Sequence, residues 1–269
     1  MSEAKQKLGS RDKRPLGIPT VTDRIVQSAL RSVIEPIFEK DFAEHSYGFR
    51  PGRGCKDALR RVDELLKGGR TWVVDADLKS YFDTIPHDRL MKLVENKIAD
   101  GRVLELIRGY LKQGVMDSHR HAEAGESGTP QGAVISPLLA NICLDPLDQN
   151  MAASGCEMVR YADDFIILCH TEEEAEGALK AVQQWTAEAG LTLHPEKTRI
   201  VDANQPGGFD FLGYHFERGK KTPRKKSLGK FQESIRSETR RTSGQSMKTI
   251  ISKLTPKMRG WFEQLPAMF

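Results

Sequence analysis

The chain has 269 residues, of which 38% are hydrophobic and 29% charged, and this is enough apolar content for one large domain or two small ones. No apolar run approaches the roughly 20 residues that span a bilayer, which excludes a membrane-spanning protein. The N-terminus lacks the apolar segment of a secretory signal, so we expect a reducing, cytoplasmic compartment. The four cysteines show no Cys-x-x-Cys spacing, which favours buried free thiols over a zinc site.

The net charge of +4 is unevenly distributed along the chain. Residues 218–241 contain ten Lys or Arg residues and two Glu residues, so the remainder is mildly acidic. A basic segment of this kind suits a polyanion such as nucleic acid. The alternative is a solvated or disordered tail that binds no partner.

The first predicted elements are a polar leader and two helices. Residues 1–13 are polar and aperiodic, which indicates a flexible leader or the stump of a larger segment. Apolar residues then repeat at helical spacing from Asp23, predicted as the cap, to Pro36, where we expect the helix to kink or end. An apolar stripe over 58–66 predicts a second helix, which stops at Gly68.

A buried strand is predicted over 72–78, because this segment is rich in β-forming residues and follows a Gly-Gly break. Its period of two places Asp75 and Asp77 on one face. Downstream, periodicity and breakers predict helices at 87–99, at 102–112 and from 135, a weaker strand region up to 124, and a loop over 125–132.

The segment 159–168 predicts a strand, a turn that holds Asp163 and Asp164, and a second strand. Thr171 begins a capped helix that ends near Gly190. Short strands are predicted at 191–193, 199–201 and 209–216, followed by a basic helical region after residue 227. Because strands and helices alternate without a regular βαβ period, we predict an α+β fold with a mostly antiparallel sheet.

Two adjacent aspartates at the tip of an apolar hairpin are energetically costly, since like charges repel and desolvation penalises both, so we expect something to neutralise them. Together with Asp77, Asp163 and Asp164 form a carboxylate set that can bridge two Mg²⁺ ions. The chemistry indicated is phosphoryl or nucleotidyl transfer. The alternative is an ordinary Asp-rich turn beside a solvent-facing edge strand.

Tyr161-Ala-Asp-Asp resembles the YADD box of reverse transcriptases. Six further blocks resemble those of bacterial group II intron reverse transcriptases and occur in the same order. They are RPLGIPT (14–20), HSYGFRPGR (45–53), DADLKSYFD (75–83), GTPQGAVISPLLAN (128–141), LHPEKT (193–198) and FDFLGY (209–214). The resemblance implies a right-hand polymerase palm, an antiparallel sheet with helices. We expect partial fingers over 1–70, the palm with inserted helices over 71–216, and a basic thumb-like or maturase-like start over 217–269.

The resemblance also implies site residues. The catalytic and metal-binding set is Asp77, Asp163 and Asp164 with the backbone carbonyl of Leu78, holding two Mg²⁺ ions or Mn²⁺ as a substitute; Asp75 is a neighbour. Residues implied in nucleotide binding are Lys13, Arg14, Arg24, Phe82, Gln131, Gly132 and Lys197. Phe82 matches the position under the incoming sugar or is a core phenylalanine, and Lys197 either protonates pyrophosphate or is a surface lysine. Phe211, Leu212 and Gly213 resemble the primer grip or form a core strand, and Arg224, Lys225 and Lys226 contact nucleic-acid backbone.

The function implied is an RNA-directed DNA polymerase that joins dNTPs to a primer 3′-hydroxyl. Its expected partners are an RNA template or intron RNA, a DNA or RNA primer, and dNTPs. Compared with the family, the chain is short at both ends, so we expect a truncated protein whose missing regions come from upstream or in trans. Two alternatives are an RNA-binding maturase without polymerase activity and an inactive fragment.

Overall fold

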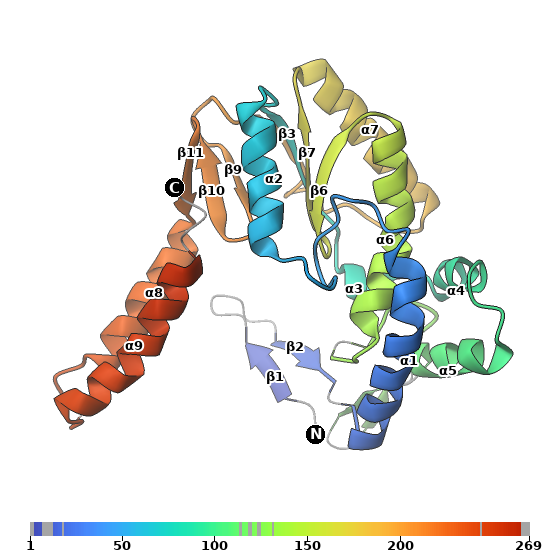
Figure 1. The fold of residues 1–269 in the computed structure, drawn as a ribbon, viewed down its shortest axis with the longest axis horizontal. Coiled ribbons are helices and arrows are strands. Elements are labelled where there is room, and N and C mark those ends of the chain that lie inside the picture. The colour runs from blue at the N-terminus through green and yellow to red at the C-terminus, as the bar shows by residue number, and fades with distance from the viewer. Residues whose placement is uncertain are drawn as a thin grey trace.

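The computed structural model describes residues 3–6, 13–17, 19–112, 115–117, 120–122, 125–130, 132–242 and 244–264. Its centre is a four-stranded sheet with the strand order β6–β7–β3–β8, in which each pair of neighbours is antiparallel. Strands β6, β7 and β3 are seen side by side in Figure 1. The strands are β3 (Trp72–Asp77), β6 (Glu157–Tyr161), β7 (Asp164–Cys169) and β8 (Arg199–Asp202). The predicted antiparallel α+β fold is confirmed.

Alternate side chains of the central sheet enter two apolar clusters, as the period of two requires. On one face, Val74 and Phe165 pack in a cluster with residues of α4 (His87–Glu95), α6 (Ser136–Ala153) and α7 (Glu172–Glu188). On the other face, Val73 and Ile166 pack with residues of α2 (Cys55–Lys67) and of a smaller sheet. The sheet is therefore covered on both sides.

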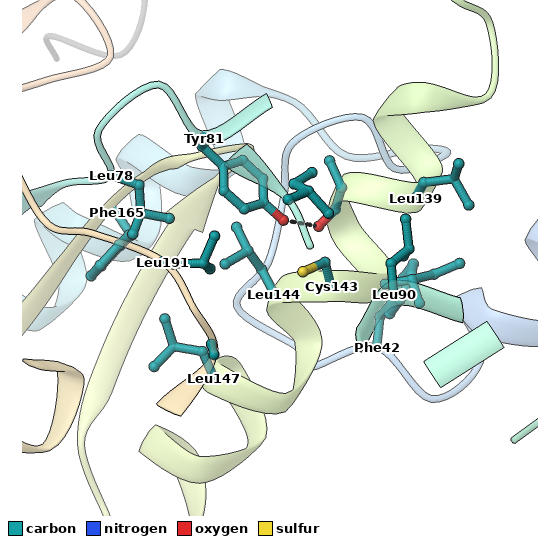
Figure 2. Close-up of a cluster of buried hydrophobic side chains, with 14 of the residues drawn as sticks. Phe42, Leu78, Tyr81, Leu90, Leu139, Cys143, Leu144, Leu147, Phe165 and Leu191 are labelled. Carbon is teal, nitrogen blue, oxygen red and sulfur yellow. Dashed lines mark hydrogen bonds between the residues drawn. The ribbon is translucent and has the colours of Figure 1, made fainter. Parts of the chain in front are cut away.

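Helix α6 forms the middle of the larger cluster, and residues over its whole length are buried. The short helix α3 (Tyr81–Thr84), which follows β3, is fixed to it by a side chain. The Tyr81 hydroxyl donates to the Ala140 carbonyl at 2.7 Å (Figure 2). The segment that leaves the end of β3 is therefore held against α6.

The smaller sheet has the order β11–β10–β9 and comprises β9 (Phe209–Phe211), β10 (Tyr214–Glu217) and β11 (Lys220–Pro223). The rings of Phe209 and Phe216 stack 4.9 Å apart inside the second cluster. Helices α8 (Lys225–Glu238) and α9 (Met247–Gln264) follow and pack on each other, projecting away from the sheets (Figure 1). We call these two helices the C-terminal hairpin.

The remaining elements lie around this framework. Helix α1 (Val21–Glu39) packs on α6, and α5 (Gly101–Leu111) packs on α4. Two small hairpins complete the described chain, β1 (Glu3–Gln6) with β2 (Lys13–Leu16) and β4 (Val115–Asp117) with β5 (Arg120–Ala122). No helix in the described part of the chain is long and apolar enough to cross a membrane.

Several predicted details of the N-terminal half are wrong. Thr20, not Asp23, caps α1, because the Thr20 hydroxyl accepts from the Asp23 N–H at 3.1 Å, and the helix does not end at Pro36 but continues to Glu39. Residues within the predicted leader form β1 and pair with β2. Cys55 is exposed because it begins α2, whereas Cys143 and Cys169 are buried as predicted.

Differences also occur in the C-terminal half. The segment 209–216 is not one strand but two, separated by a turn at Leu212 and Gly213, both of which have positive φ. The predicted strand at 191–193 is only an isolated bridge between Leu193 and Leu78. Strand β11 was not predicted. The domain boundary at residue 70 stays a prediction; α2, on its N-terminal side, packs on the central sheet.

Candidate active site at the end of the central sheet

Carboxylates from two adjacent strands meet where β3 ends and β7 begins. The register pairs Asp77 directly with Asp164 and Asp75 with Ile166. Because side chains alternate along a strand, Asp75, Asp77 and Asp164 lie on the face of the sheet that carries α2 and the smaller sheet. The predicted common face of Asp75 and Asp77 thus agrees with the structure.

The third predicted carboxylate, Asp163, lies in a two-residue hairpin loop between β6 and β7. The first loop residue, Ala162, has a φ of 61°, a left-handed value that is uncommon for residues other than glycine. Gly48 packs against this loop so closely that a Cβ atom at residue 48 would lie 2.1 Å from the Ala162 nitrogen. The loop that presents Asp163 is therefore tightly enclosed.

Desolvation and the negative charges of the neighbouring carboxylates raise the pKa of Asp164. Although the Asp164 side chain keeps solvent exposure, the surrounding protein desolvates its carboxyl group, and the charges of Asp75, Asp163 and Asp77 add to this, raising the pKa of Asp164 to about 7. Burial likewise raises the pKa of Asp75, against the lowering effect of Arg199. The site thus favours the binding of positive charge.

Two basic side chains supply part of that charge. Lys197 Nζ pairs with Asp77 Oδ2, and Arg199 Nε lies 3.3 Å from Asp75 Oδ2. The turn that carries Lys197 is fixed to β3, since the His194 N–H donates to the Asp77 carbonyl at 2.7 Å. The structure therefore places Lys197 beside the predicted catalytic carboxylates.

The backbone at Leu78 bears on its predicted role as a carbonyl ligand. Leu78 bridges to Leu193, and the hydrogen bonds of this bridge come from the flanking residues, including Lys79 N–H to the Thr192 carbonyl at 2.8 Å. In such a pair the peptide groups of the bridged residue point away from the partner. The Leu78 carbonyl consequently points to the side of β3 on which β7 lies.

Phe82 lies in α3, five residues after Asp77, and is half-buried. Its ring contacts Phe49 edge to face, with centroids 6.4 Å apart. Its backbone carbonyl accepts the Thr129 N–H at 2.7 Å, and Gly128 approaches Asp83 so closely that a Cβ would lie 2.9 Å from the Asp83 carbonyl oxygen. The block at 128–141 is thereby joined to the segment that carries Phe82.

The structure describes only some of the other predicted nucleotide-binding residues. Gly132 has a positive φ of 100° and is exposed. Arg24 is exposed near the start of α1, and the same helix contacts the turn after Gly132 because Gln27 Oε1 accepts the Val134 N–H at 2.8 Å. Gln131 and the side chains of Lys13 and Arg14 lie outside the described residues.

The predicted primer-grip and backbone-binding residues lie on the smaller sheet and α8. Phe211 is buried in the second cluster, and Leu212 and Gly213 form the turn between β9 and β10. Arg224 Nε pairs with Asp210 Oδ2 at 2.9 Å, so it joins α8 to this sheet. Lys225 and Lys226 are exposed in the first turn of α8.

The donor chemistry fits a hard divalent cation, because carboxylate and carbonyl oxygens are the ligands that Mg²⁺ takes in proteins. Within the described residues, however, no three His, Cys, Asp or Glu side chains are grouped closely enough to hold a metal ion. Asp77 and Asp75 are paired with Lys197 and Arg199 instead. The carboxylates are thus brought to one end of the sheet without forming a completed metal site.

Sequence reasoning missed the residues beneath the loop that carries Asp163. Arg160, Asp148 and Asn141 form a buried polar group there, and Gly48 packs on the loop. Asn141 and Gly48 occur in recognisable blocks, but nothing in the spacing indicates that they meet. A buried charged pair such as Arg160 and Asp148 has no periodic signal in the sequence.

Comparisons with known proteins agree with this architecture. Residues 4–216 match the family described as Reverse transcriptase (RNA-dependent DNA polymerase). The chain is 37% identical over 247 residues to Protein YkfC of Escherichia coli (strain K12), which covers 76% of this chain and 63% of that protein. It is 44% identical over 143 residues to the Group II intron-encoded protein LtrA of Lactococcus lactis subsp. cremoris, covering 53% of this chain and 24% of that protein.

Among solved structures, the fold is similar to that of telomerase from Candida tropicalis in complex with a TWJ fragment of telomeric RNA. The TM-score is 0.60 at 13% identity, and the match covers 91% of this chain and 46% of that chain. At this identity the likeness concerns the fold alone. The chain spans less than two thirds of YkfC and about a quarter of LtrA.

Proposed function

The chain belongs to the reverse transcriptase family, and from this premise we propose that it is an RNA-directed DNA polymerase of the group II intron type. It extends a primer 3′-hydroxyl on an RNA template with dNTPs. The observation that carries the proposal is the pairing of Asp77 with Asp164 across β3 and β7, beside the loop that presents Asp163. Members of this family use divalent metal ions, and the donor set here suits them.

We assign the metal-binding role to the carboxylates of Asp77, Asp163 and Asp164 and to the Leu78 carbonyl. Two bound Mg²⁺ ions, or Mn²⁺ in their place, supply Lewis-acid activation of the primer hydroxyl and offset the charge of the triphosphate. The raised pKa of Asp164 supports this role, because it reports a cluster of negative charge that a cation relieves.

The chain's own residues hold the nucleotide. Lys197 Nζ, beside Asp77, donates a proton to the departing pyrophosphate. Phe82 lies under the incoming sugar. Lys13, Arg14 and Arg24 contact the triphosphate, and Gln131 and Gly132 line the nucleotide site. The contact between Phe82 and Thr129 supports this grouping, since it joins two of these segments.

The smaller sheet and the C-terminal hairpin hold the nucleic acid. Phe211, Leu212 and Gly213 form the primer grip. Lys225 and Lys226 lie in the first turn of α8, where positive charge is unfavourable for the helix dipole. Basic residues placed against the dipole are explained by an external anion, and the phosphate backbone is the anion that fits. Arg224 joins this surface to the sheet through Asp210.

Primer extension tests the proposal. The purified chain is incubated with an annealed RNA template and DNA primer, dNTPs and Mg²⁺, and the products are resolved by length. We expect extension that EDTA abolishes and that a dideoxynucleotide stops after one addition. A DNA template and an rNTP mixture serve as controls for template and sugar class. Wild-type protein that binds the primer-template but adds no nucleotide contradicts the polymerase assignment.

A second candidate is an RNA-binding splicing cofactor, and the exposed basic turn of α8 and the likeness to a group II intron-encoded protein favour it. The two functions differ in one result. Salt-sensitive binding to structured RNA without extension supports the second candidate, whereas extension supports the first.

A further inference from the structure

Arg160, at the end of β6, is a buried charge that the proposed function does not use. Its side chain is 1% exposed and points to the α6 side of the sheet, where it meets the 5% exposed side chain of Asp148. Arg160 Nε lies 2.8 and 2.9 Å from the two Asp148 oxygens, and Nη2 lies 2.5 Å from Oδ2. The pair is therefore bidentate and removed from water, the geometry in which an ion pair is most directional.

The remaining guanidinium nitrogen makes two further bonds. Arg160 Nη1 donates to Asn141 Oδ1 at 2.9 Å and to the Ala162 carbonyl at 2.8 Å. The bond to Ala162 reaches forward along the chain to the loop that carries Asp163. Asp148 and Asn141 both belong to α6, so one side chain connects this helix to the loop.

The network extends to the other side of the same loop. Asn141 Nδ2 donates to the Gly48 carbonyl at 2.8 Å, and Gly48 is the residue that packs against Ala162. The backbone of Arg160 also pairs with the segment before Gly48, through Tyr47 N–H to the Arg160 carbonyl at 2.9 Å. Arg160 therefore holds the loop from below and Gly48 holds it from the side. Asn141 is hydrogen-bonded to both of these residues.

We propose that Arg160 is a positioning residue that fixes the Ala162–Asp163 loop, and through it the Asp163 carboxylate, in the geometry that binds the metal ions; this rests on the proposed polymerase function. Ala162 adopts a left-handed φ that alanine seldom takes without support. Arg160 Nη1 donates a hydrogen bond to the carbonyl of this strained residue. Asp148 and Asn141 hold the guanidinium, and the guanidinium holds the loop.

If the pair of Arg160 and Asp148 only stabilised the fold, a different result would be expected from removing it. Replacing both members of a buried pair by apolar residues of similar volume is often neutral or favourable for stability, whereas removing one member leaves an unpaired buried charge. The double variant Arg160→Met/Asp148→Leu therefore keeps the core filled but removes the donor to the Ala162 carbonyl. It separates the positioning role from the stabilising one.

The matched control uses the other end of the same strand. Arg61 of α2 pairs with Glu157 of β6 at 2.8 Å and makes no bond to the loop. The double variant Arg61→Met/Glu157→Leu removes an ion pair between β6 and a helix while leaving the Asp163 loop untouched. The single variant Arg160→Lys keeps the charge beside Asp148, but lysine lacks the planar fork that reaches Asp148, Asn141 and Ala162 together.

Three measurements are made on wild type and on each variant: the melting temperature, Mn²⁺ binding followed by electron paramagnetic resonance without nucleotide, and single-nucleotide extension as a function of dNTP concentration. For Arg160→Met/Asp148→Leu we expect a protein that still unfolds cooperatively and binds Mn²⁺ at least about tenfold more weakly than wild type. We expect its kcat to be lower by about a hundredfold, while its KM for dNTP stays within about threefold of wild type. Arg160→Lys lies between wild type and the double variant. The Arg61→Met/Glu157→Leu control keeps wild-type Mn²⁺ affinity and kcat.

The Mn²⁺ measurement keeps the two proposals separable. Wild type that binds Mn²⁺ but does not extend a primer contradicts the polymerase function and still lets the affinity of the double variant decide the role of Arg160. A folded double variant with wild-type Mn²⁺ affinity overturns the positioning role. If the double variant does not fold, Arg160→Lys decides in the same way, because it retains the buried ion pair.

Discussion

The end of the central sheet and the C-terminal hairpin are built on opposite principles. Around Asp163 the backbone is enclosed by Gly48 and bonded by the buried Arg160. In the hairpin none of residues 225–238 is buried, and the two helices meet through exposed ion pairs, such as Glu238 with Lys257, and through the stacked rings of Phe231 and Trp261, 4.3 Å apart. One region fixes a few atoms, whereas the other displays charge over a surface.

This difference follows from what each region is proposed to contact. Metal ions and a reacting phosphate require ligand positions that do not move, which buried bonds supply. A nucleic-acid backbone is a repeating polyanion, and exposed basic side chains bind it without a fixed geometry. Substitutions in the two regions are therefore expected to change different quantities, the reaction rate in the first and the salt dependence of binding in the second.

The largest expected effect is that of Asp163→Asn, which removes a metal ligand without changing size. We expect primer extension to fall by roughly a thousandfold or more, because a metal clamp contributes several kcal/mol to the transition state. RNA binding and the melting temperature change little. The control Asp202→Asn alters a carboxylate opposite Trp72, at the far end of β3, and keeps activity. Near-wild-type extension by Asp163→Asn removes Asp163 from the site.

The next effect concerns the choice of sugar. Phe82→Val shortens the side chain proposed to lie where a ribose 2′-hydroxyl projects, so rNTP incorporation relative to dNTP rises by at least about tenfold. Single-nucleotide extension with each nucleotide class measures the ratio. The control Phe38→Val alters a buried ring of α1 and changes stability alone. An unaltered ratio in a folded, active Phe82→Val protein makes Phe82 an ordinary core residue.

A smaller effect is expected in the hairpin. Lys225→Ala combined with Lys226→Ala removes up to two phosphate contacts, which lowers the slope of log K against log salt by up to about 1.4 for single-stranded RNA. Binding weakens for all sequences alike while kcat is kept. Arg224→Ala is measured separately, since Arg224 is paired with Asp210 and its loss also loosens α8. A slope identical to that of wild type makes the two lysines a solvated face.

The smallest expected effect is on stability. Most substitutions destabilise a protein, whereas this one is expected to stabilise it. Asp164→Asn removes a carboxylate whose pKa is raised to about 7, so without metal the variant is more stable than wild type above its unfolded-state pKa. The gain grows from about pH 4 to pH 7 and is constant above. Because the side chain is exposed, solvent screening keeps the rise in melting temperature to roughly 2–4 °C at pH 8. A lower melting temperature at pH 8 contradicts the crowding of carboxylates.

Local patterns were sufficient to predict much of the fold. The apolar run before Asp75, the hairpin around Asp163 and the glycine ends of α2 and α7 all depend on neighbours in the sequence. The turn at Leu212 and Gly213 was missed because aromatic residues continue on both sides of it. Strands β1 and β11 are polar, and their pairing depends on a partner strand rather than on their own pattern.

The sequence predicts which carboxylates could form the site, but it does not predict the residues that hold them in place. The YADD box and the DADL block predict the carboxylates, which the structure brings to one end of the sheet, and the period of two places Asp75 and Asp77 on one face. The pairing of Lys197 with Asp77 and the contact of Gly48 with Ala162 join segments far apart in the chain. Such contacts depend on register and packing, which no local spacing reports.

The position of β3 in the central sheet has a consequence for how the chain is made. Its hydrogen-bonding neighbours, β7 and β8, are synthesised long after it, so Trp72–Asp77 emerges as an apolar strand with no partner. Unpaired strands of this composition are prone to aggregate while folding is incomplete. Asp75 and Asp77 interrupt this apolar run with charge, and charged residues within apolar strands are the feature by which natural sequences limit such aggregation. Of these two residues, Asp77 is also assigned to metal binding in the finished protein.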